Sequence, residues 1–401
     1  MHPAELDSGV LPLEDVTVID LTQVLAGPFA SMTFGDMGAE VIKIEAVGRG
    51  DRSRNIQPAP AYFDVVNRNK QSIALDLKSE EGQAVARRLA SEADVFIEST
   101  KAGRAESYNL GYEDIRELNP EIIYCSVTGF GRNSPYEDVP AWDMLIQAMS
   151  GIMSMTGEPD GPPVWSGLPS GDLGAAMYAT QSVLAALYAR EQGLIEGEWI
   201  EVPMFDAAIS WLTLRAGHSF GTGEPFPRAG TRHPSMAPFG SFECGDGGLL
   251  IIATGTDSLW SDLCDAIERP ELYDDERFST VADRLENREA LVAAIESALE
   301  PRDADAWIER LHAYSVPAGP IHDTCSVWDD EYVQQRQLRQ RMERDGREDA
   351  DMIDHPVHFS NLGTRLEIAP QELGESTDDI LERYGYTQAE IGRLREQNVV
   401  E

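Results

Sequence analysis

Residues 16–45, VTVIDLTQVLAGPFASMTFGDMGAEVIKIE, decide the fold class. This stretch opens with a β-branched run at 16–21, which predicts a strand. Residues 27–38 follow as a predicted helix, and a second β-branched run at 40–45 predicts another strand. Strand, helix and strand in this order are typical of an α/β fold with a parallel sheet.

The same alternation continues outward from this stretch. Residues 79–90 predict a helix with Ser79 as its N-cap. Further strands are predicted at 94–98, 122–126 and 199–203, and a long helix at 175–190. Ligands bind at the carboxyl ends of the strands in such sheets. We therefore expect binding residues in three loops, at 22–28, 99–103 and 127–135.

The pattern changes after a Gly-, Pro- and Arg-rich segment at 215–240. Residues 241–253 predict a hairpin that turns at 245–247. Helices are expected at 259–267, 288–299 and 304–312, so this part forms a smaller α+β unit. Residues 326–401 end in an amphipathic helix at 387–397.

The charge balance is extreme. The chain has 70 Asp and Glu against 32 Lys and Arg, a net charge of −38, and only Lys43, Lys70, Lys78 and Lys101 are lysines. Nucleic acid is excluded as a partner, because little neutralises phosphates. Such a charge repels itself unless concentrated salt screens it. A protein from a salt-in halophile is therefore expected, and an unusually acidic mesophilic protein is the alternative.

Membrane, secretory and metal-binding functions find no support. No run of about 18 apolar residues is present, so no membrane partner is expected. Residues 1–7 lack the layout of a signal peptide, which predicts a cytoplasmic protein. The four cysteines, expected to be buried and reduced, form no CxxC pair, and there is no HExxH motif, so no metal site is predicted.

Asp172 is the foremost candidate for chemistry. It lies between Gly171 and Gly174, directly before the apolar stretch at 175–190. An Asp there can cap the helix, worth about 1 kcal/mol. It can also be a nucleophile that the helix dipole keeps ionised. Asp143 has the same choice before residues 144–153, and Lys101 is either a solvated loop residue or an anion contact. Spacing alone leaves these alternatives open.

Several short blocks occur together along the chain, namely 18–28, 35–45 and 50–52, 67–70, 75–78 and 81–82, 110–113, 119–120 and 128–131, 140–143 and 147–148, 171–172, and 316–321. Together these blocks resemble the class III CoA-transferase family, also called CaiB/BaiF. The resemblance runs from about residue 12 to the C-terminus, and the block up to Arg52 is the most specific. It implies a Rossmann-like large domain, a smaller α+β domain and an interlocked, ring-like homodimer.

The resemblance also implies a domain division and a reaction. Residues 1–214 would begin the large CoA-binding domain, 215–240 would be a linker, 241–325 the small domain, and 326–401 the return to the large domain. The substrates would be an acyl-CoA thioester and a free carboxylic acid, with no permanently bound cofactor. Asp172 would attack the thioester and form an anhydride and then an aspartyl-CoA thioester.

Further site residues follow from the same resemblance. Gln23, Val24 and Ala26 match positions lining the thioester end of CoA, Lys101 a CoA-phosphate ligand, and Asp143 an acid near the nucleophile. Succinyl-CoA is the favoured donor, and mesaconate or another C4 or C5 dicarboxylate the favoured acceptor. A distal carboxylate needs a cation, and four residues are candidates for it: Arg132, Arg228, Arg232 and His233.

Two alternatives to CoA transfer were weighed. Racemases of the family carry a His where this chain has Trp142, and an indole cannot exchange an α-proton, so the racemase alternative lacks its acid/base partner. A non-catalytic CoA-binding protein would be expected to lack Asp172. The chain also departs from formyl-CoA transferases at Ser99-Thr100 and at 234–238, so we do not expect formyl or oxalyl transfer.

Overall fold

The computed structural model describes residues 9–56, 61–344 and 346–401. Residues 1–7, on which the expected lack of a signal peptide rests, lie outside the described residues. The chain divides into two compact units. Unit 1 contains the chain up to Ile152, Ser166–Thr213 and Glu331–Glu401, and unit 2 contains Met153–Trp165 and Leu214–Asp330.

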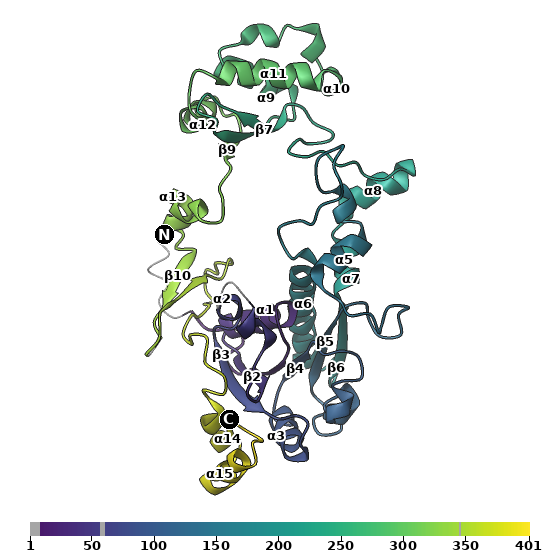
Figure 1. The fold of residues 1–401 in the computed structure, drawn as a ribbon, viewed down its shortest axis with the longest axis vertical. Coiled ribbons are helices and arrows are strands. Elements are labelled where there is room, and N and C mark those ends of the chain that lie inside the picture. Colours follow the sequence, from purple (N-terminus) through teal and green to yellow (C-terminus); the bar gives the residue numbers. More distant parts are fainter. Residues whose placement is uncertain (1–8, 57–60, 345) are drawn as a thin grey trace. The chain divides into compact units, whose positions relative to one another are not determined.

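A six-stranded, all-parallel sheet forms the centre of unit 1 (Figure 1). Its order, 3-2-1-4-5-6, is the order of a dinucleotide-binding Rossmann sheet. The predicted parallel α/β fold is therefore confirmed. The strands are β3 (Lys70–Leu75), β2 (Glu40–Ala46), β1 (Thr17–Leu21), β4 (Val95–Glu98), β5 (Ile123–Thr128) and β6 (Glu198–Pro203).

Strand β3 escaped prediction from the sequence. It opens with Lys70, Gln71 and Ser72, which resemble a surface loop, yet Lys70 and Ser72 are buried. Strands β1, β2, β4 and β5 are buried along most of their length, as expected for strands covered on both faces, whereas the edge strand β6 is largely exposed or half-buried.

Helices cover the sheet of unit 1. Ser79 caps α3 as predicted, because its Oγ accepts a hydrogen bond from the Gly82 N–H at 3.0 Å. Helix α1 packs against α6. The helices are α1 (Ala26–Asp36), α2 (Ala61–Asp64), α3 (Glu80–Ala90), α4 (Tyr112–Arg116), α5 (Asp143–Ser150), α6 (Ser170–Glu191), α7 (Met204–Ser210), α13 (Glu331–Gln335), α14 (Thr377–Arg383) and α15 (Gln388–Glu396).

The C-terminal segment returns to this sheet. The Asp76 N–H donates to the Val399 carbonyl at 2.8 Å, and Val400 forms an antiparallel bridge with Leu75. Side chains of α14, α15 and residues 399–400 share one apolar core with the strands. The return segment also forms a hairpin of β10 (Arg339–Met342) and β11 (Ala350–Ile353).

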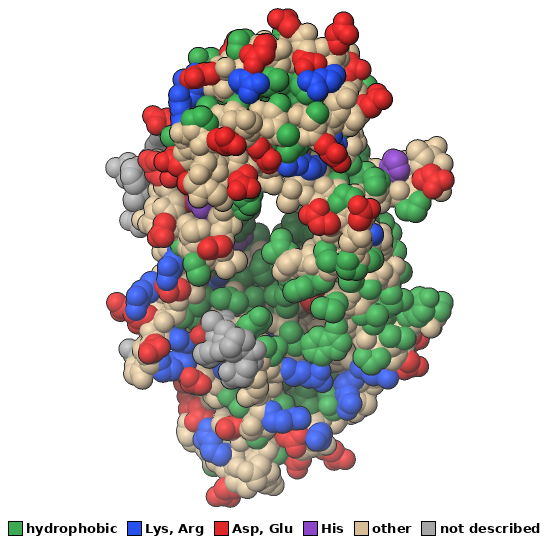
Figure 2. Space-filling model, turned by 45° about the horizontal axis from the view of Figure 1, so that its top comes forward, with side chains coloured by type: hydrophobic (Ala, Val, Ile, Leu, Met, Phe, Trp, Pro, Cys, Tyr) green, Lys and Arg blue, Asp and Glu red, His purple; other side chains and the backbone are tan. Residues whose placement is uncertain are grey.

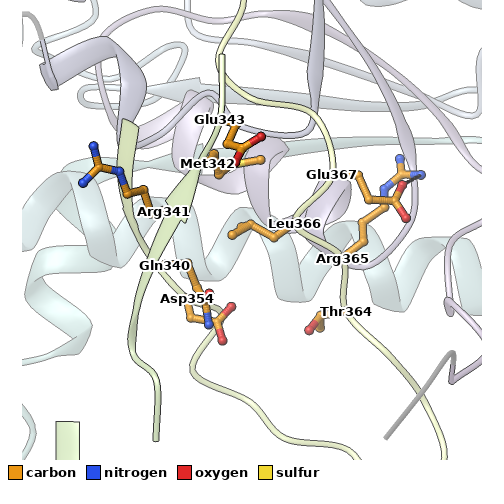
Figure 3. A pocket seen from close by; sticks show the side chains of 9 residues that line it. All are labelled: Gln340, Arg341, Met342, Glu343, Asp354, Thr364, Arg365, Leu366 and Glu367. Carbon is orange, nitrogen blue, oxygen red and sulfur yellow. Dashed lines mark ion pairs between the residues drawn. The ribbon is translucent and has the colours of Figure 1, made fainter. Parts of the chain in front are cut away.

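A cavity of about 530 Å³ lies beside this hairpin. Figure 3 shows its lining side chains, which come from the hairpin and from residues 364–367. None of the predicted site residues is among them. The lining is Gln340, Arg341, Met342, Glu343, Asp354, Thr364, Arg365, Leu366 and Glu367.

Unit 2 is a small α+β unit with its own apolar core. The predicted hairpin is present, as β7 (Phe239–Glu243) and β8 (Leu249–Ala253), and β9 (Ala318–Pro320) pairs with β8. The helices are α8 (Thr213–Thr222), which starts at the boundary, α9 (Asp257–Ala266), α10 (Val281–Glu286), α11 (Arg288–Leu299) and α12 (Ala304–Ala313).

Carboxylates are spread over the visible face rather than gathered in one patch (Figure 2). No helix in the described ranges is long and apolar enough to cross a membrane. Cys125, Cys244 and Cys264 are buried free thiols, as expected, but Cys325 is exposed, so the prediction that all four are buried is wrong for it.

Candidate functional site

Asp172 lies inside the first turn of α6. The helix begins at Ser170, earlier than the predicted 175, and its N-cap position is Pro169, which makes no side-chain cap. The reading of Asp172 as an N-cap is therefore wrong. The carboxylate is half-buried and accepts a hydrogen bond from the Ala26 N–H at the start of α1. Asp172 thus lies where the starts of two helices meet.

Asp143 anchors the start of α6. Its Oδ1 accepts from the Gly171 N–H at 2.8 Å, and its Oδ2 accepts from Gln147 Nε2 at 2.7 Å. Gln147 Nε2 also donates to the Leu168 carbonyl at 2.9 Å. A side chain at Gly171 could not fit, because its Cβ would lie 2.8 Å from Ile146 Cγ2. Asp143 is the first residue of α5 and not its cap, so the capping alternative is wrong here too.

Burial and the neighbouring carboxylate of Asp143 set the pKa of Asp172. Burial, and then the charge of Asp143, raise the pKa of Asp172 from 3.8 to about 7. The hydrogen bond from the Ala26 N–H lowers the pKa of Asp172, but its effect is smaller than that of burial and Asp143. The expectation that the helix dipole keeps this carboxylate ionised is therefore overridden. A carboxylate with such a pKa is more basic, and hence more nucleophilic, than an ordinary one.

The loop after β1 brings Gln23, Val24 and Ala26 to this place. The Gln23 N–H donates to Ser99 Oγ at 3.1 Å, which joins the loops after β1 and β4 at the point where the strand order reverses. Open α/β sheets bind ligands at this point. Val24 has a φ of 69°, a strained conformation for a β-branched residue. The surrounding structure must therefore hold the loop in place.

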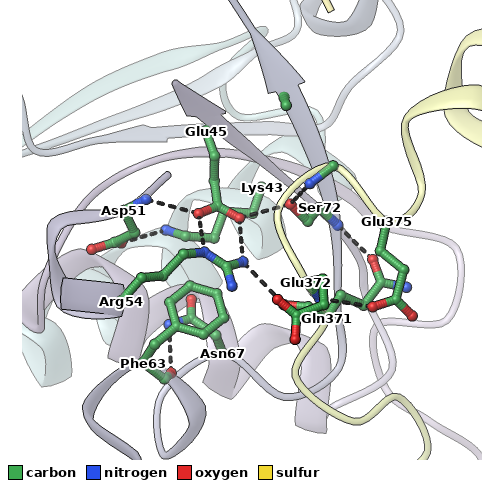
Figure 4. A network of polar contacts seen from close by, with 12 residues as sticks. Lys43, Glu45, Asp51, Arg54, Phe63, Asn67, Ser72, Gln371, Glu372 and Glu375 are labelled. Atoms are coloured by element: carbon green, nitrogen blue, oxygen red, sulfur yellow. Dashed lines mark hydrogen bonds and ion pairs between the residues drawn. The ribbon is translucent and has the colours of Figure 1, made fainter. Parts of the chain in front are cut away.

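A buried charge network supports the loop. The Val24 N–H donates to both carboxylate oxygens of Asp51, at 3.1 and 3.3 Å. Lys43 Nζ lies 3.0 Å from Asp51 Oδ2 and donates to the Thr22 carbonyl at 2.9 Å (Figure 4). Burial raises the pKa of Asp20, but Lys43 and Lys70 outweigh it and lower that pKa below its usual range.

The same network continues to the C-terminal segment. Glu45 accepts from Arg54 Nε and Nη2, both at 2.7 Å, and Arg54 stacks on Phe63 and donates to the Gln371 carbonyl (Figure 4). Every charge in this group faces an opposite one. The residues form a scaffold beneath the site.

Comparison with known proteins agrees with this geometry. The model of CoA-transferase family III matches residues 13–377. The chain belongs to this family. Class III CoA-transferases act on CoA thioesters and carboxylic acids and hold no permanent cofactor. Within the described ranges, no group of three or more His, Cys, Asp or Glu is placed to hold a metal.

Individual class III CoA-transferases resemble it over most of their length. The acetyl-CoA:oxalate CoA-transferase of Acetobacter aceti is 41% identical over 79% of this chain and 82% of its own. The succinyl-CoA:mesaconate CoA-transferase of Haloarcula marismortui is 36% identical over 84% and 87%. A crystal structure of a CaiB/BaiF family protein from Brucella suis covers 94% of this chain and all of its own, with 34% identity and a TM-score of 0.87.

Two further predicted ligands of this class III CoA-transferase lie in the loops after β4 and β5. Lys101 is exposed on the loop after β4 and pairs with Asp138 at 3.1 Å. Exposed pairs of this kind are weak, so an incoming phosphate can replace Asp138. Arg132 is bound to Glu106 and stacks over Trp199, so its charge is already compensated.

The remaining three candidates belong to unit 2. Arg228 donates to the carbonyls of Ser154, Glu158 and Gly161 and holds the 153–165 segment. Arg232 and His233 lie just before β7, and Arg232 pairs with Glu296 at 3.6 Å.

Sequence reasoning missed two kinds of residue. Lys43 and Lys70 were recognised as two of only four lysines, but of the four only Lys101 was considered as an anion contact. Arg215 and Arg288, which lie beside His233, were not singled out as ligands. A scarcity of positive charge could have drawn attention to both groups.

Proposed function

We propose that this protein transfers CoA from succinyl-CoA to mesaconate or another C4 or C5 dicarboxylic acid, with Asp172 as the nucleophile. One observation carries the role of Asp172. Its carboxylate, with a pKa near 7, faces the Ala26 N–H at the start of α1. This arrangement suits attack on a thioester carbonyl.

The reaction would proceed through two kinds of covalent intermediate. An Asp172 oxygen attacks the thioester carbonyl carbon, the C–S bond breaks, and CoA leaves as a thiolate, giving a mixed anhydride. The thiolate then attacks Cγ of Asp172 and releases the donor acid as a carboxylate, giving an aspartyl-CoA thioester. The acceptor carboxylate attacks the same Cγ, CoA thiolate leaves again, and it attacks the acceptor carbonyl to restore Asp172.

Asp143, Gln23, Val24, Ala26 and Lys101 would serve this reaction around the nucleophile. Asp143 fixes the first turn of α6 through Gly171 and makes Asp172 more basic. The loop of Gln23, Val24 and Ala26 would line the thioester end of CoA, and Lys101 would bind a CoA phosphate in place of Asp138.

The intermediates can be trapped. Hydroxylamine added after succinyl-CoA should convert Asp172 to a hydroxamate, identified by mass spectrometry of its peptide, and should inactivate the enzyme. Without acyl-CoA no modification is expected. Modification of any other carboxylate, or none during turnover, would remove Asp172 from this role.

The choice of succinyl-CoA and of a C4 or C5 dicarboxylate is supported by the relative named for succinyl-CoA and mesaconate, whereas the relative named for acetyl-CoA and oxalate favours a C2 acid. A panel of free acids, each incubated with succinyl-CoA, tests it. Mesaconate and other C4 or C5 dicarboxylates should react fastest. Preference for a monocarboxylic acid of equal length would refute the assignment.

We further propose that the protein is a cytoplasmic enzyme adapted to concentrated salt. The net charge of −38 and the spread of carboxylates support this (Figure 2). Dialysis from molar KCl into dilute buffer should unfold the protein. Circular dichroism measures this unfolding. Unchanged structure at low salt would contradict the adaptation.

We also propose an interlocked homodimer. Large apolar side chains on α5, α6, α7 and adjoining residues are exposed, a feature of association surfaces. Light scattering in molar KCl should give twice the mass of 44.2 kDa. A monomer would refute the proposal. The side chains are Trp142, Met144, Met177, Ile209 and Trp211.

The division into domains at 214 and 325 stays our proposal. The compact units, which change at Thr213–Leu214 and at Asp330–Glu331, support it. Limited proteolysis should cut first near these positions if the two domains fold separately.

A further inference from the structure

The loop after β1 has an unfavourable backbone conformation at one residue. Val24 has a φ of 69°, in the left-handed region that β-branched residues avoid. A free loop would return Val24 to a negative φ, because its branched side chain crowds the backbone. Contacts from the surrounding structure must therefore maintain the observed conformation. The direction in which the chain enters α1, which begins two residues later at Ala26, depends on these contacts.

The Asp51 carboxylate makes the contact that holds Val24. Both of its oxygens accept from the Val24 N–H, at 3.1 and 3.3 Å. Asp51 is itself fixed, because Oδ1 accepts from the N–H and Oγ of Ser53, both at 2.8 Å, and its own N–H donates to Glu45 at 2.8 Å (Figure 4). Burial raises the pKa of Asp51, but Lys43 and Ser53 outweigh burial and lower that pKa. The carboxylate is therefore ionised, which strengthens its hydrogen bonds.

Lys43 connects this carboxylate to the start of the loop. Its Nζ lies 3.0 Å from Asp51 Oδ2 and donates to the Thr22 carbonyl at 2.9 Å. The N–H and Oγ1 of Thr22 donate to Asp20 Oδ1, which fixes Thr22 at the end of β1. All four of these residues are buried, so water does not compete for the contacts. The loop is therefore held on both sides of Gln23.

The loop leads directly to Asp172. Ala26 begins α1, and α1 packs against α6, the helix that carries Asp172. The Ala26 N–H donates to the Asp172 carboxylate. A change of φ at Val24 would turn the chain that follows and displace this N–H. The conformation of Val24 thus links Asp51 to Asp172.

We propose that Asp51, held by Lys43, is a positioning residue that keeps Val24 in the left-handed conformation and so places Ala26 against the nucleophile. This rests on the proposed function, in which Asp172 attacks the thioester. Asp51 takes no part in bond making and acts only through the loop. Without its carboxylate Val24 would relax, and only a minor fraction of the molecules would have the loop in place.

The test combines Asp51→Asn with changes at Val24. The amide cannot accept from the Val24 N–H through both atoms, so kcat/KM of the folded protein should fall about 10- to 100-fold. Glycine adopts a positive φ freely, whereas alanine does not. Added to Val24→Gly, Asp51→Asn should therefore cost only about threefold or less, but added to Val24→Ala it should still cost about 10- to 100-fold. Equal costs in the two backgrounds would overturn the proposal.

Asp94→Asn is the matched control. Asp94 also accepts a backbone N–H, from Thr17 at 2.9 Å, and also pairs with a cation, Arg190 at 2.7 Å, but it lies at the amino end of the strands. Its substitution should leave kcat/KM of the folded protein unchanged, with or without Val24→Gly. A loss like that of Asp51→Asn would mean that any such carboxylate is needed for the fold, and would overturn the proposal.

The pH profile reports the position of Ala26. Its hydrogen bond lowers the pKa of Asp172, so loss of this bond should raise that pKa. In Asp51→Asn, kcat/KM should therefore rise at a higher pH than in the parent, and Asp94→Asn should keep the parental profile. A shift to lower pH would mean that Asp51 acts through its charge and not through the loop, which contradicts the proposal.

Urea unfolding separates this proposal from the proposed function, because it needs no substrate. With Asp51 intact, Val24→Gly should be more stable than Val24→Ala, the reverse of the usual order, since only glycine fits a positive φ without strain. This order is expected even if no acid is a substrate. The usual order would show that Val24 is not held in the left-handed conformation and would overturn the proposal. The expected order with no modification of Asp172 during turnover would refute the proposed function alone.

Discussion

The buried charges of unit 1 face opposite charges, whereas the guanidinium groups around His233 in unit 2 largely do not. Beneath the loop after β1, Lys43 and Lys70 each face carboxylates and carbonyl oxygens, so the charges balance within the protein. Around His233, three guanidinium groups share one distant carboxylate. At the start of α6, Asp172 lies beside the like charge of Asp143, which raises its pKa.

This difference distinguishes charges that stabilise the fold from charges that are available for function. A balanced group gains its stability inside the folded chain and needs nothing more. Like charges held close together raise the free energy of the folded protein. This cost is relieved when a ligand or a reaction supplies the opposite charge. Experiments that change one member of each group test this distinction.

The largest effect on activity is expected at Asp172. Asp172→Asn should lower CoA transfer about 10³-fold or more, because the nucleophile is lost. It should also stabilise the protein at pH 8. The folded pKa of about 7 exceeds the unfolded 3.8, so this stabilisation is absent near pH 3, grows between the unfolded and the folded pKa, and levels off above pH 7 at about 1–3 kcal/mol.

Initial rates and urea unfolding at the two pH values measure both parts. An inactive variant that is less stable than the parent at pH 8 would mean that misfolding, and not loss of the nucleophile, explains the result.

The next effect concerns the balanced group. Lys43→Met should cost about 3–5 kcal/mol of unfolding free energy, because Asp20 and Asp51 would remain buried without their partner. Arg88→Met, which removes an exposed pair with Glu92, is the control and should cost about 0.5 kcal/mol. Similar costs for the two variants would show that the buried network is no scaffold.

A smaller effect should follow from weakening the acidic pair. Asp143→Asn keeps an oxygen for the Gly171 N–H but removes the charge that raises the pKa of Asp172. Burial still raises the pKa of Asp172 in the variant. The nucleophile must be ionised, so kcat/KM should rise with pH through about 7 in the parent and at a lower pH in the variant. An unchanged profile would assign that pH dependence to another group.

The smallest effect is expected among the guanidinium groups around His233. Without ligand, Arg215→Gln removes a repelling charge and should raise stability by about 0.5 kcal/mol, whereas Arg277→Gln should not. Thermal unfolding at constant ionic strength measures this, and destabilisation by Arg215→Gln would argue that Arg215 is structural.

The sequence was informative where a local pattern determines the structure. Apolar runs predicted five of the six parallel strands, and the N-cap of α3 was identified from Ser79 and its acidic neighbours. Strand β3 was missed because its buried Lys70 depends on Asp20, a partner far away in the chain. No local pattern reports such a pair.

The candidate site shows the same limit. Asp172 and its neighbours on the loop after β1 came from a family pattern, and the structure brings Ala26 to the Asp172 carboxylate. The capping alternative failed because the helix starts at Ser170, a boundary that Pro169 and tertiary contacts set. The raised pKa required knowledge of burial and of Asp143, which spacing cannot supply.

The attachment of residues 399–400 to the edge of the sheet has a consequence for biosynthesis. Domains commonly fold as they leave the ribosome. Unit 2 is complete once Asp330 has emerged, but β3 must wait for Val399 and Val400, which are translated much later. The nascent chain would therefore carry an exposed strand edge through most of its synthesis, and its dense negative charge would help to keep neighbouring copies on a polysome apart.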